Sequence, residues 1–250
     1  MTVPQLDAPL YDEMRLAHSI SWWDEVAECT LVMSQPAIDR ELWYEFLRGA
    51  ARSYRKHGVE RVLDVAAIRH GDDTSLFWVA IDSAGRVVGG VRAKGPLTSA
   101  QESHALVEWA GQPGLPAVHK MITDRLPFGV VEIKSAWVTD DIDRNRSLTD
   151  VLARVPLHST AALNAQFAMA TAASHVIARW ISSGGVVAAR IPATPYPDDR
   201  YRTKIMWWDR NTFANYAEPI QSATTLTEIV ALNRHLDPLR DGAVRQASTV

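Results

Sequence analysis

Two charged residues interrupt an otherwise apolar stretch at residues 130–138, which reads VVEIKSAWV. Its β-branched and aromatic residues favour a strand, and side chains alternate between the two faces of a strand. Glu132 and Lys134 are therefore expected on the same face. Because a carboxylate removed from water is costly unless it is paired or hydrogen-bonded, we predict that this face meets a cleft and that both charges are partly exposed.

The chemistry open to Glu132 has two interpretations. A carboxylate facing a cleft can accept the proton of an attacking amine, and partial burial would raise its pKa towards neutrality. The alternative is a structural ion pair with Lys134, Arg92 or another basic residue, without any chemistry. Arg92 follows two glycines that allow close backbone approach, so it either orients a substrate carboxylate or carbonyl or lies at the surface. We expect Glu132 within reach of Arg92.

Composition excludes several classes of protein. The 250 residues carry a formal net charge of -3 and a pI of about 6.2, which implies no general attraction to nucleic acid or to an anionic membrane. The single cysteine, Cys29, excludes an internal disulfide and a cysteine-rich zinc site. The eight histidines show no metal-ligand spacing, so no metal site is predicted. There is no secretory-signal pattern and no apolar run of about 18 residues, and we expect a cytoplasmic protein without a membrane span.

The order of expected elements predicts an α/β (α+β) fold, with a central mixed, mostly antiparallel sheet and helices on both faces. The strands are expected at 28–35, 61–68, 75–81, 86–94, 130–138, 186–191 and 201–208, and the helices at 37–57, in two pieces within 98–126, at 161–181 and at 225–235. The charged segment 139–157 is left unassigned. We expect an N-terminal arm (1–27), a single domain (28–236) and a mobile tail (237–250).

The helix expected at 161–181 depends on one apolar stripe and on many alanines. The stripe consists of Leu163, Phe167, Ala170, Ser174, Ile177 and Ile181, spaced three or four residues apart. We expect this helix to pack across the sheet.

The order of elements over residues 28–208 resembles the GNAT-type N-acyltransferase fold. Two segments are similar to motifs of one branch, the acyl-homoserine-lactone synthases and related N-acyl amino acid synthases. Residues 89–98, GGVRAKGPLT, resemble the motif G-x-x-R-L-x-P-T with Arg92 at the arginine position. Residues 131–138, VEIKSAWV, resemble E-I-S-R-F-A-V with Glu132 at the glutamate position.

The chain also departs from these patterns. Ser135 stands where the synthases have arginine, and Lys134 either substitutes for that arginine or does not. The acidic residues that precede the hairpin in the family have three possible counterparts, Asp64, Asp72 and Asp73. The glycine-containing phosphate loop of ordinary GNAT enzymes is absent after Val138, where the chain reads TDDIDRNR.

The resemblance implies an enzyme that moves an acyl group from an acyl thioester to the amine of a small molecule such as an amino acid derivative. The donor would be acyl-CoA or an acyl carrier protein, used as a co-substrate, with no permanently bound cofactor. The implied residues are Glu132 and Tyr201 in catalysis, Arg92 and Lys134 in substrate binding, and Ala136, Trp137, Val138, Thr139, Arg144 and Arg146 in donor binding.

Each of these roles has a plainer alternative. Tyr201 is either the general acid for the departing thiolate or a packed tyrosine with a solvated hydroxyl. Arg144 and Arg146 either hold phosphate or belong to a solvated loop. We expect a pantetheine-sized groove beside residues 136–139, with the start of the 161–181 helix at its phosphate end. The alternative to an enzyme is a GNAT-like domain that binds a ligand or a protein without chemistry.

Overall fold

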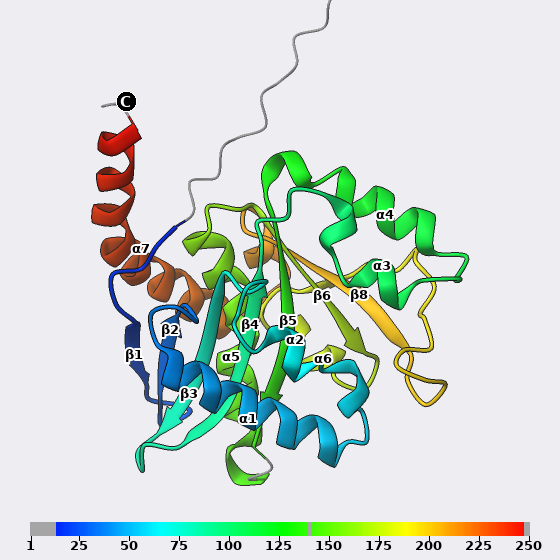
Figure 1. Cartoon of the computed structure of the whole chain (residues 1–250), viewed down its shortest axis with the longest axis horizontal. Coiled ribbons are helices and arrows are strands. Elements are labelled where there is room, and N and C mark those ends of the chain that lie inside the picture. The colour runs from blue at the N-terminus through cyan, green and yellow to red at the C-terminus, as the bar shows by residue number, and fades with distance from the viewer. Residues whose placement is uncertain (1–13, 140–141, 248–250) are drawn as a thin grey trace, which may run out of the picture.

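The sheet at the centre of the molecule has eight strands in the order β1-β2-β3-β4-β5-β6-β8-β7 (Figure 1). The structure is a computed structural model that describes residues 14–139 and 142–247, without the side chains of 142–145 and 238–247. The strands are β1 (Ile20–Asp24), β2 (Cys29–Ser34), β3 (Leu76–Asp82), β4 (Val87–Lys94), β5 (Val130–Val138), β6 (Phe167–Ala173), β7 (Val186–Val187) and β8 (Thr203–Asp209). Of the neighbouring pairs, β5 and β6 run parallel and the others antiparallel. The predicted mixed, mostly antiparallel sheet is confirmed.

The β3–β4 hairpin forms where it was predicted. The turn is closed by the Asp82 carboxylate, which accepts hydrogen bonds from the backbone N–H groups of Ala84 and Arg86. Gly85 takes the positive φ of 76° that the turn requires. The second strand of the hairpin pairs antiparallel with β5, from Gly89↔Val138 to Lys94↔Glu132. The hairpin therefore adjoins β5 as expected.

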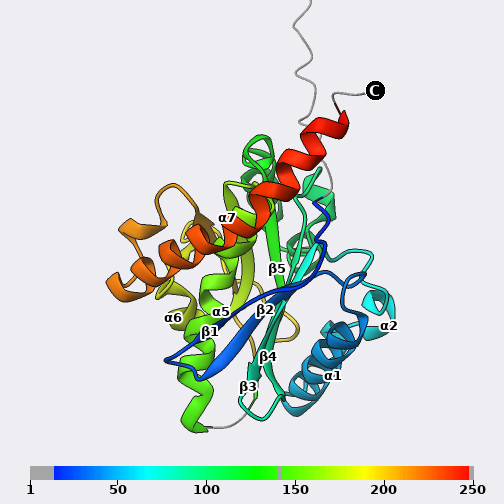
Figure 2. The ribbon, with the colours of Figure 1, turned by 90° about the vertical axis from the view of Figure 1, so that its left-hand side faces the viewer.

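Helices cover both faces of the sheet. Figure 2 shows α1 on one side and α5 on the other, with α7 on the α5 side. The helices are α1 (Arg40–Lys56), α2 (Val65–Ile68), α3 (Ala105–Glu108), α4 (Leu115–Thr123), α5 (Ile142–Ala162), α6 (Ile177–Ile181) and α7 (Pro219–Ala247), and the 3-10 turns are η1 (Glu60–Val62), η2 (Ala100–Glu102), η3 (Leu126–Phe128) and η4 (Phe213–Asn215). Among the described residues, no helix combines the length and the apolar character that crossing a membrane needs.

Side chains alternate between the two faces of the sheet, so the buried apolar residues form separate clusters on each face. Val131 and Ala170 belong to the large cluster beneath α5 and α7. On the other face, Val130 and Met169 belong to a cluster beneath α3 and α4, whereas Trp43 belongs to a separate cluster beneath α1. The face that carries α1, α3 and α4 therefore holds two apolar clusters, and polar side chains of β4 and β5 lie between them.

The helix predicted at 161–181 is wrong. That stretch contains the end of α5, all of β6 and the short α6. β6 lies between β5 and β8, so its backbone pairs on both sides as far as Ala170 and with β8 alone after that, and its alanines lie against α5. Tertiary pairing overrides the helix propensity of alanine here.

Several boundaries also differ from the predictions. The unassigned segment 139–157 forms most of α5, and the strand expected at 61–68 is the turn η1 followed by α2. Residues 20–24, assigned to the arm, pair with β2 as an edge strand. The last helix, expected at 225–235, spans Pro219–Ala247 and so includes most of the segment expected to be a mobile tail.

Gly49 gives a direct test of the packing beneath α1. A Cβ at this position would lie 1.9 Å from the nearest Trp137 ring atom. Because Trp137 is buried and cannot move away freely, Gly49→Ala is expected to lower the free energy of unfolding by about 1–3 kcal/mol. Urea denaturation measures this. Arg52→Ala, at an exposed site on the same helix, should change it little, and equal stability of both variants would contradict the packing.

Candidate active site

The parallel strands β5 and β6 separate part-way along their length. They share four residue pairs, from Val130↔Phe167 to Ile133↔Ala170, whereas β6 continues to pair with β8 as far as Ala173↔Thr203. Beyond Ile133, the second half of β5 has no strand partner on the β6 side among the described residues. A wedge therefore opens between residues 134–138 of β5 and residues 171–173 of β6.

A β-bulge marks the beginning of this wedge. Arg92 pairs with Lys134 and Gly90 with Trp137, so two residues of β5 lie opposite one residue of β4. The first of these two, Ser135, has a φ of 54°, a conformation that is uncommon for a residue with a side chain and that recurs at functional sites. The bulge changes the direction of the β5 side chains at the point where the sheet opens.

Glu132 is buried, with 2 % of its surface exposed. Its Oε1 accepts a hydrogen bond of 3.0 Å from the Ser103 hydroxyl, and its Oε2 accepts one of 3.1 Å from the backbone N–H of His104. The Lys134 Nζ lies 4.0 Å from the same Oε2. Our prediction of a partly exposed Glu132 is wrong, because the loop before α3 covers this carboxylate and satisfies it.

Arg92 is buried against a different set of partners. Its guanidinium donates to the Asp73 carboxylate at 2.8 Å, to the Thr74 hydroxyl at 3.0 Å and to the Ser135 hydroxyl at 3.3 Å. Of the three acidic residues considered before the hairpin, Asp73 is thus the one bonded to Arg92, whereas Asp64 caps α2 through the N–H of Ala67. The expected contact between Arg92 and Glu132 is replaced by the Asp73 pair.

A second buried carboxylate, Glu108, was not predicted. It lies at the end of α3, and its Oε1 accepts a hydrogen bond of 2.8 Å from the Thr171 hydroxyl, on the part of β6 that diverges from β5. Its Oε2 is buried and has no hydrogen-bond partner among the described residues. Burial raises the pKa of Glu108 to about 7, against the opposing effects of Thr171 and Lys134. This carboxylate can therefore exchange a proton near neutral pH.

Neutral and basic groups surround Glu108. The Nε2 of His104 lies 2.9 Å from the Tyr196 hydroxyl and 3.9 Å from the Glu108 Oε1. Burial, followed by the charge of Lys134, lowers the pKa of His104 to about 4, so its ring is uncharged at neutral pH. Burial also lowers the pKa of Lys134, against the effect of Glu132. It raises the pKa values of Tyr196 and Tyr54 to about 12.

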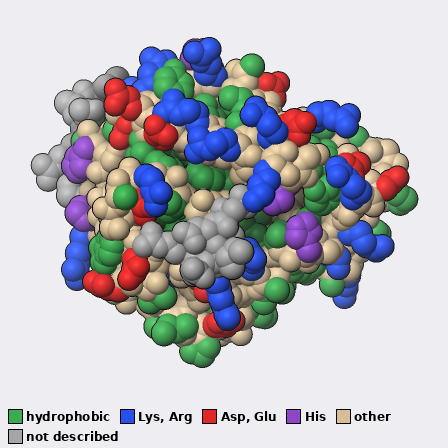
Figure 3. Space-filling model, turned by 90° about the horizontal axis from the view of Figure 1, so that it is seen from below, with side chains coloured by type: hydrophobic (Ala, Val, Ile, Leu, Met, Phe, Trp, Pro, Cys, Tyr) green, Lys and Arg blue, Asp and Glu red, His purple; other side chains and the backbone are tan. Residues whose placement is uncertain are grey.

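The residues predicted to bind the acyl donor do not lie together in the structure. Residues 136–139 run along the diverging edge of β5, but the Trp137 side chain packs into the cluster beneath α1. Arg146 is exposed on α5. Figure 3, which views the molecule from below, shows basic side chains spread over the surface of that face. The Arg144 side chain lies outside the described residues.

Tyr201 is placed away from these groups. Its hydroxyl donates a hydrogen bond of 3.3 Å to the carbonyl of His57, just after α1. The tyrosine that the structure brings to Glu108 and His104 is Tyr196, from the proline-rich segment before it. The expected role of Tyr201 as a general acid has no contact here to support it.

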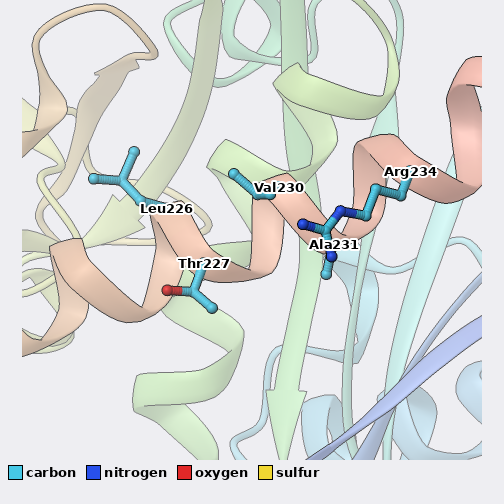
Figure 4. A pocket seen from close by; sticks show the side chains of 5 residues that line it. All are labelled: Leu226, Thr227, Val230, Ala231 and Arg234. Atoms are coloured by element: carbon cyan, nitrogen blue, oxygen red, sulfur yellow. The ribbon is translucent and has the colours of Figure 1, made fainter.

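One surface hollow lies near the site, and another lies on the opposite side of the sheet. One, of about 170 Å³, is lined by Tyr54 and by residues of η1 and α2. The other, of about 370 Å³, lies along α7 between side chains that include Leu226, Val230 and Arg234 (Figure 4). The α7 hollow lies on the opposite side of the sheet from Glu108 and has only Arg234 as a charged lining residue, so we assign no chemistry to it.

Comparisons with known proteins place the chain among mycobacterial relatives. No family model matches it. The uncharacterized proteins Rv1356c of Mycobacterium tuberculosis H37Rv and Mb1391c of Mycobacterium bovis are each 54% identical to it over 239 residues, which is 96% of this chain and 91% of theirs. The chain belongs to this mycobacterial family.

The fold has a solved counterpart outside the family. FeeM, an N-acyl amino acid synthase from uncultured soil microbes, superimposes with a TM-score of 0.55 and 10% identity, over 77% of this chain and 98% of that one. The CoA-dependent acyl-homoserine lactone synthase BjaI is similar at a TM-score of 0.48 and 16% identity, over 79% and 87% of the two chains. The superposition on FeeM shows that this chain has the fold of the GNAT-type N-acyltransferases, as the sequence resemblance predicted.

Proposed function

We propose that this protein is an N-acyltransferase that moves an acyl group from an acyl thioester to the amine of a small molecule. The observation that carries the proposal is the wedge between β5 and β6, with the partly unsatisfied carboxylate of Glu108 beside it. Such a wedge exposes strand backbone to an extended donor, and the carboxylate supplies a proton acceptor close by. The fold shared with FeeM supports acyl transfer as the reaction class.

The donor is acyl-CoA or an acyl carrier protein, with its pantetheine arm along residues 136–139. An uncharged amine attacks the thioester carbonyl carbon, a C–N bond forms, and the C–S bond breaks to release the thiol. Backbone N–H groups of β5 beyond Ile133, on the side where no described strand pairs with it, stabilise the oxyanion that develops on the carbonyl. Glu108 accepts a proton from the ammonium form of the acceptor, and the uncharged amine that results can attack.

The residues predicted from sequence take positioning roles in this proposal. Glu132 holds the Ser103–His104 turn, which begins the segment that carries Glu108, and it keeps Lys134 close by. Arg92 fixes Ser135 at the bulge. Both oxygens of Glu132 accept hydrogen bonds, whereas the Glu108 Oε2 accepts none from the residues that the structure describes, so we assign the proton acceptor to Glu108.

The alternative is a GNAT-like domain that binds a ligand or a protein without chemistry. One observation favours it: the chain between β5 and α5 contains no glycine, and glycines are what let backbone N–H groups approach a pyrophosphate closely.

Release of free thiol distinguishes the two functions. We expect the full chain to release CoA from acetyl-, butyryl-, octanoyl- or palmitoyl-CoA when a primary amine is supplied, with mass spectrometry showing the matching amide. Tyr201→Phe should retain nearly full activity, because its hydroxyl lies on the His57 carbonyl and not beside Glu108. A folded protein that releases no thiol from these donors, or from the corresponding acyl carrier proteins, would support the binding function.

A further inference from the structure

The charges around the wedge are nearly matched. Arg92 is paired with Asp73, and Lys134 lies beside Glu132. Lys94 donates to the carbonyl of Glu102, whose carboxylate accepts hydrogen bonds from Thr98. Among the described residues, Glu132, Lys134 and His104 lie close to Glu108, as do Tyr54 of α1 and Tyr196. The charges of Arg92, Lys94 and Asp73 in turn act on His104 or Lys134.

Glu108 decides the net charge of this group. With Glu108 protonated, Arg92, Lys94 and Lys134 balance Asp73, Glu102 and Glu132, because His104 and the tyrosines are uncharged at neutral pH. Ionised Glu108 would add one negative charge at a site where 8 % of the residue is exposed. Its Oε2 has no hydrogen-bond partner in the described part of the chain. An unmatched buried carboxylate of this kind is stabilised by a cation.

We propose that the acyl acceptor binds as a cation, a primary ammonium with no carboxylate beside it, which donates to the Oε2 of Glu108. This inference rests on the proposed function and names the class of its acceptor: alkyl or arylalkyl amines, and not α-amino acids. The carboxylate of an α-amino acid would have to compete with Asp73 and Glu132 for the cations of the site. The acceptor class therefore differs from the one that the synthase motifs imply.

The protons balance in this scheme. Glu108 is protonated in the empty site and loses its proton to solvent when the ammonium binds. Within the ion pair the ammonium then returns a proton to Glu108, and the neutral amine attacks the thioester. When the intermediate collapses, the nitrogen's second proton accompanies the departing sulfur. The products are the amide, the thiol and one proton in solution.

Isothermal titration of the full chain tests this with three pairs of probes that differ only in the carboxylate: tyramine and tyrosine, phenethylamine and phenylalanine, and cadaverine and lysine. At pH 6.5, we expect at least one amine to bind at least tenfold more tightly than its amino acid. Titrations in two buffers of different ionisation enthalpy should show the release of up to one proton per site. Glu108→Gln should abolish this proton release and weaken binding at least tenfold, whereas Glu25→Gln, at an exposed site in the turn between β1 and β2, should do neither.

The outcomes separate this inference from the proposed function. Amino acids that bind as tightly as the amines, amine binding without proton release, or no binding of any amine at millimolar concentration would each overturn the cation site. Thiol release that depends on amino acids and not on amines would overturn it while acyl transfer stands. Amine binding with proton release, but no thiol release from any donor, would support the cation site and contradict the proposed acyl transfer.

Discussion

Glu108→Gln is expected to reduce the rate of acyl transfer by a factor on the order of 10² to 10⁴, the usual loss when a proton-transfer group is removed. The amide keeps the size of the side chain and can still accept a hydrogen bond from Thr171, so the fold should survive. Rates of thiol release measured well below saturation with amine, where they report kcat/KM and the pKa of the free protein, give the result between pH 5 and 9. In the wild type, we expect the rate to rise as pH passes through about 7, the pKa to which burial raises this carboxyl, and the variant should lose this step.

The same substitution should stabilise the protein at alkaline pH. The folded-state pKa of Glu108 lies above the unfolded value of about 4.3, so the folded protein holds the proton more tightly. Between these two values the wild type loses stability as pH rises. Because glutamine carries no charge, Glu108→Gln should be more stable than the wild type at pH 8 by about 1–3 kcal/mol, and the difference should shrink towards pH 4.

Urea denaturation at both pH values measures this difference, with Glu25→Gln as the surface control. A variant that loses activity and stability together at pH 8 would show that Glu108 has a structural role. If Glu108 is catalytic and its ionised form destabilises the fold, Glu108→Gln should lower the rate of acyl transfer and raise the free energy of unfolding at pH 8.

Arg154→Met should be the most destabilising substitution on the opposite face of the sheet, at about 3–5 kcal/mol. Arg154 is 5 % exposed, and its guanidinium bonds to Asp24 of β1 and to Glu228 and Gln221 of α7. Methionine fills much of the same volume, but it leaves two buried carboxylates with fewer partners. Urea denaturation measures the loss. Arg146→Met, at an exposed site on the same helix, should stay close to the wild type, and similar values for both variants would contradict the network.

The pH dependence of this network has the opposite sign to that of Glu108. Burial alone would raise the pKa of Glu228, but His158 and Arg154 outweigh it and hold the pKa at about 2. This pairing therefore stabilises the fold above the unfolded pKa of about 4.3, and the contribution disappears as pH falls towards 2. Arg154→Met should be most harmful at neutral pH and should approach the wild type in acid.

The strands that line the site followed from the sequence because their patterns were local. The hairpin has a short turn with a glycine, and β5 alternates so that Val131 and Ile133 face one side while Glu132 and Lys134 face the other. Period-two alternation of this kind was present in β6 as well, where Phe167, Met169 and Thr171 share a face. The alanines between them raise helix propensity and concealed it, and only pairing with β5 and β8 decides the outcome.

Other features of the site were present in the sequence but not recognised. Leu148, Val151, Leu152 and Val155 of α5 have helical spacing, but they follow a charged segment and precede Pro156. Glu108 is a single acid in the apolar run ALVEW, the same signal that singled out Glu132. Its neighbours Thr171 and Tyr196 are 63 and 88 residues further along the chain, so no spacing rule joins them.

The four residue pairs that join β5 to β6 also affect how the two halves of the sheet can move. β1–β5 and β6–β8 are each joined internally by antiparallel pairing, and between the halves the paired residues lie only at the closed end of the wedge. A small rotation about these pairs changes the width of the open end without breaking a backbone hydrogen bond. Helix α5 packs against both halves of the sheet and so limits this rotation. Under the proposed function, the remaining freedom at the open end would let one site hold acyl groups of different thickness.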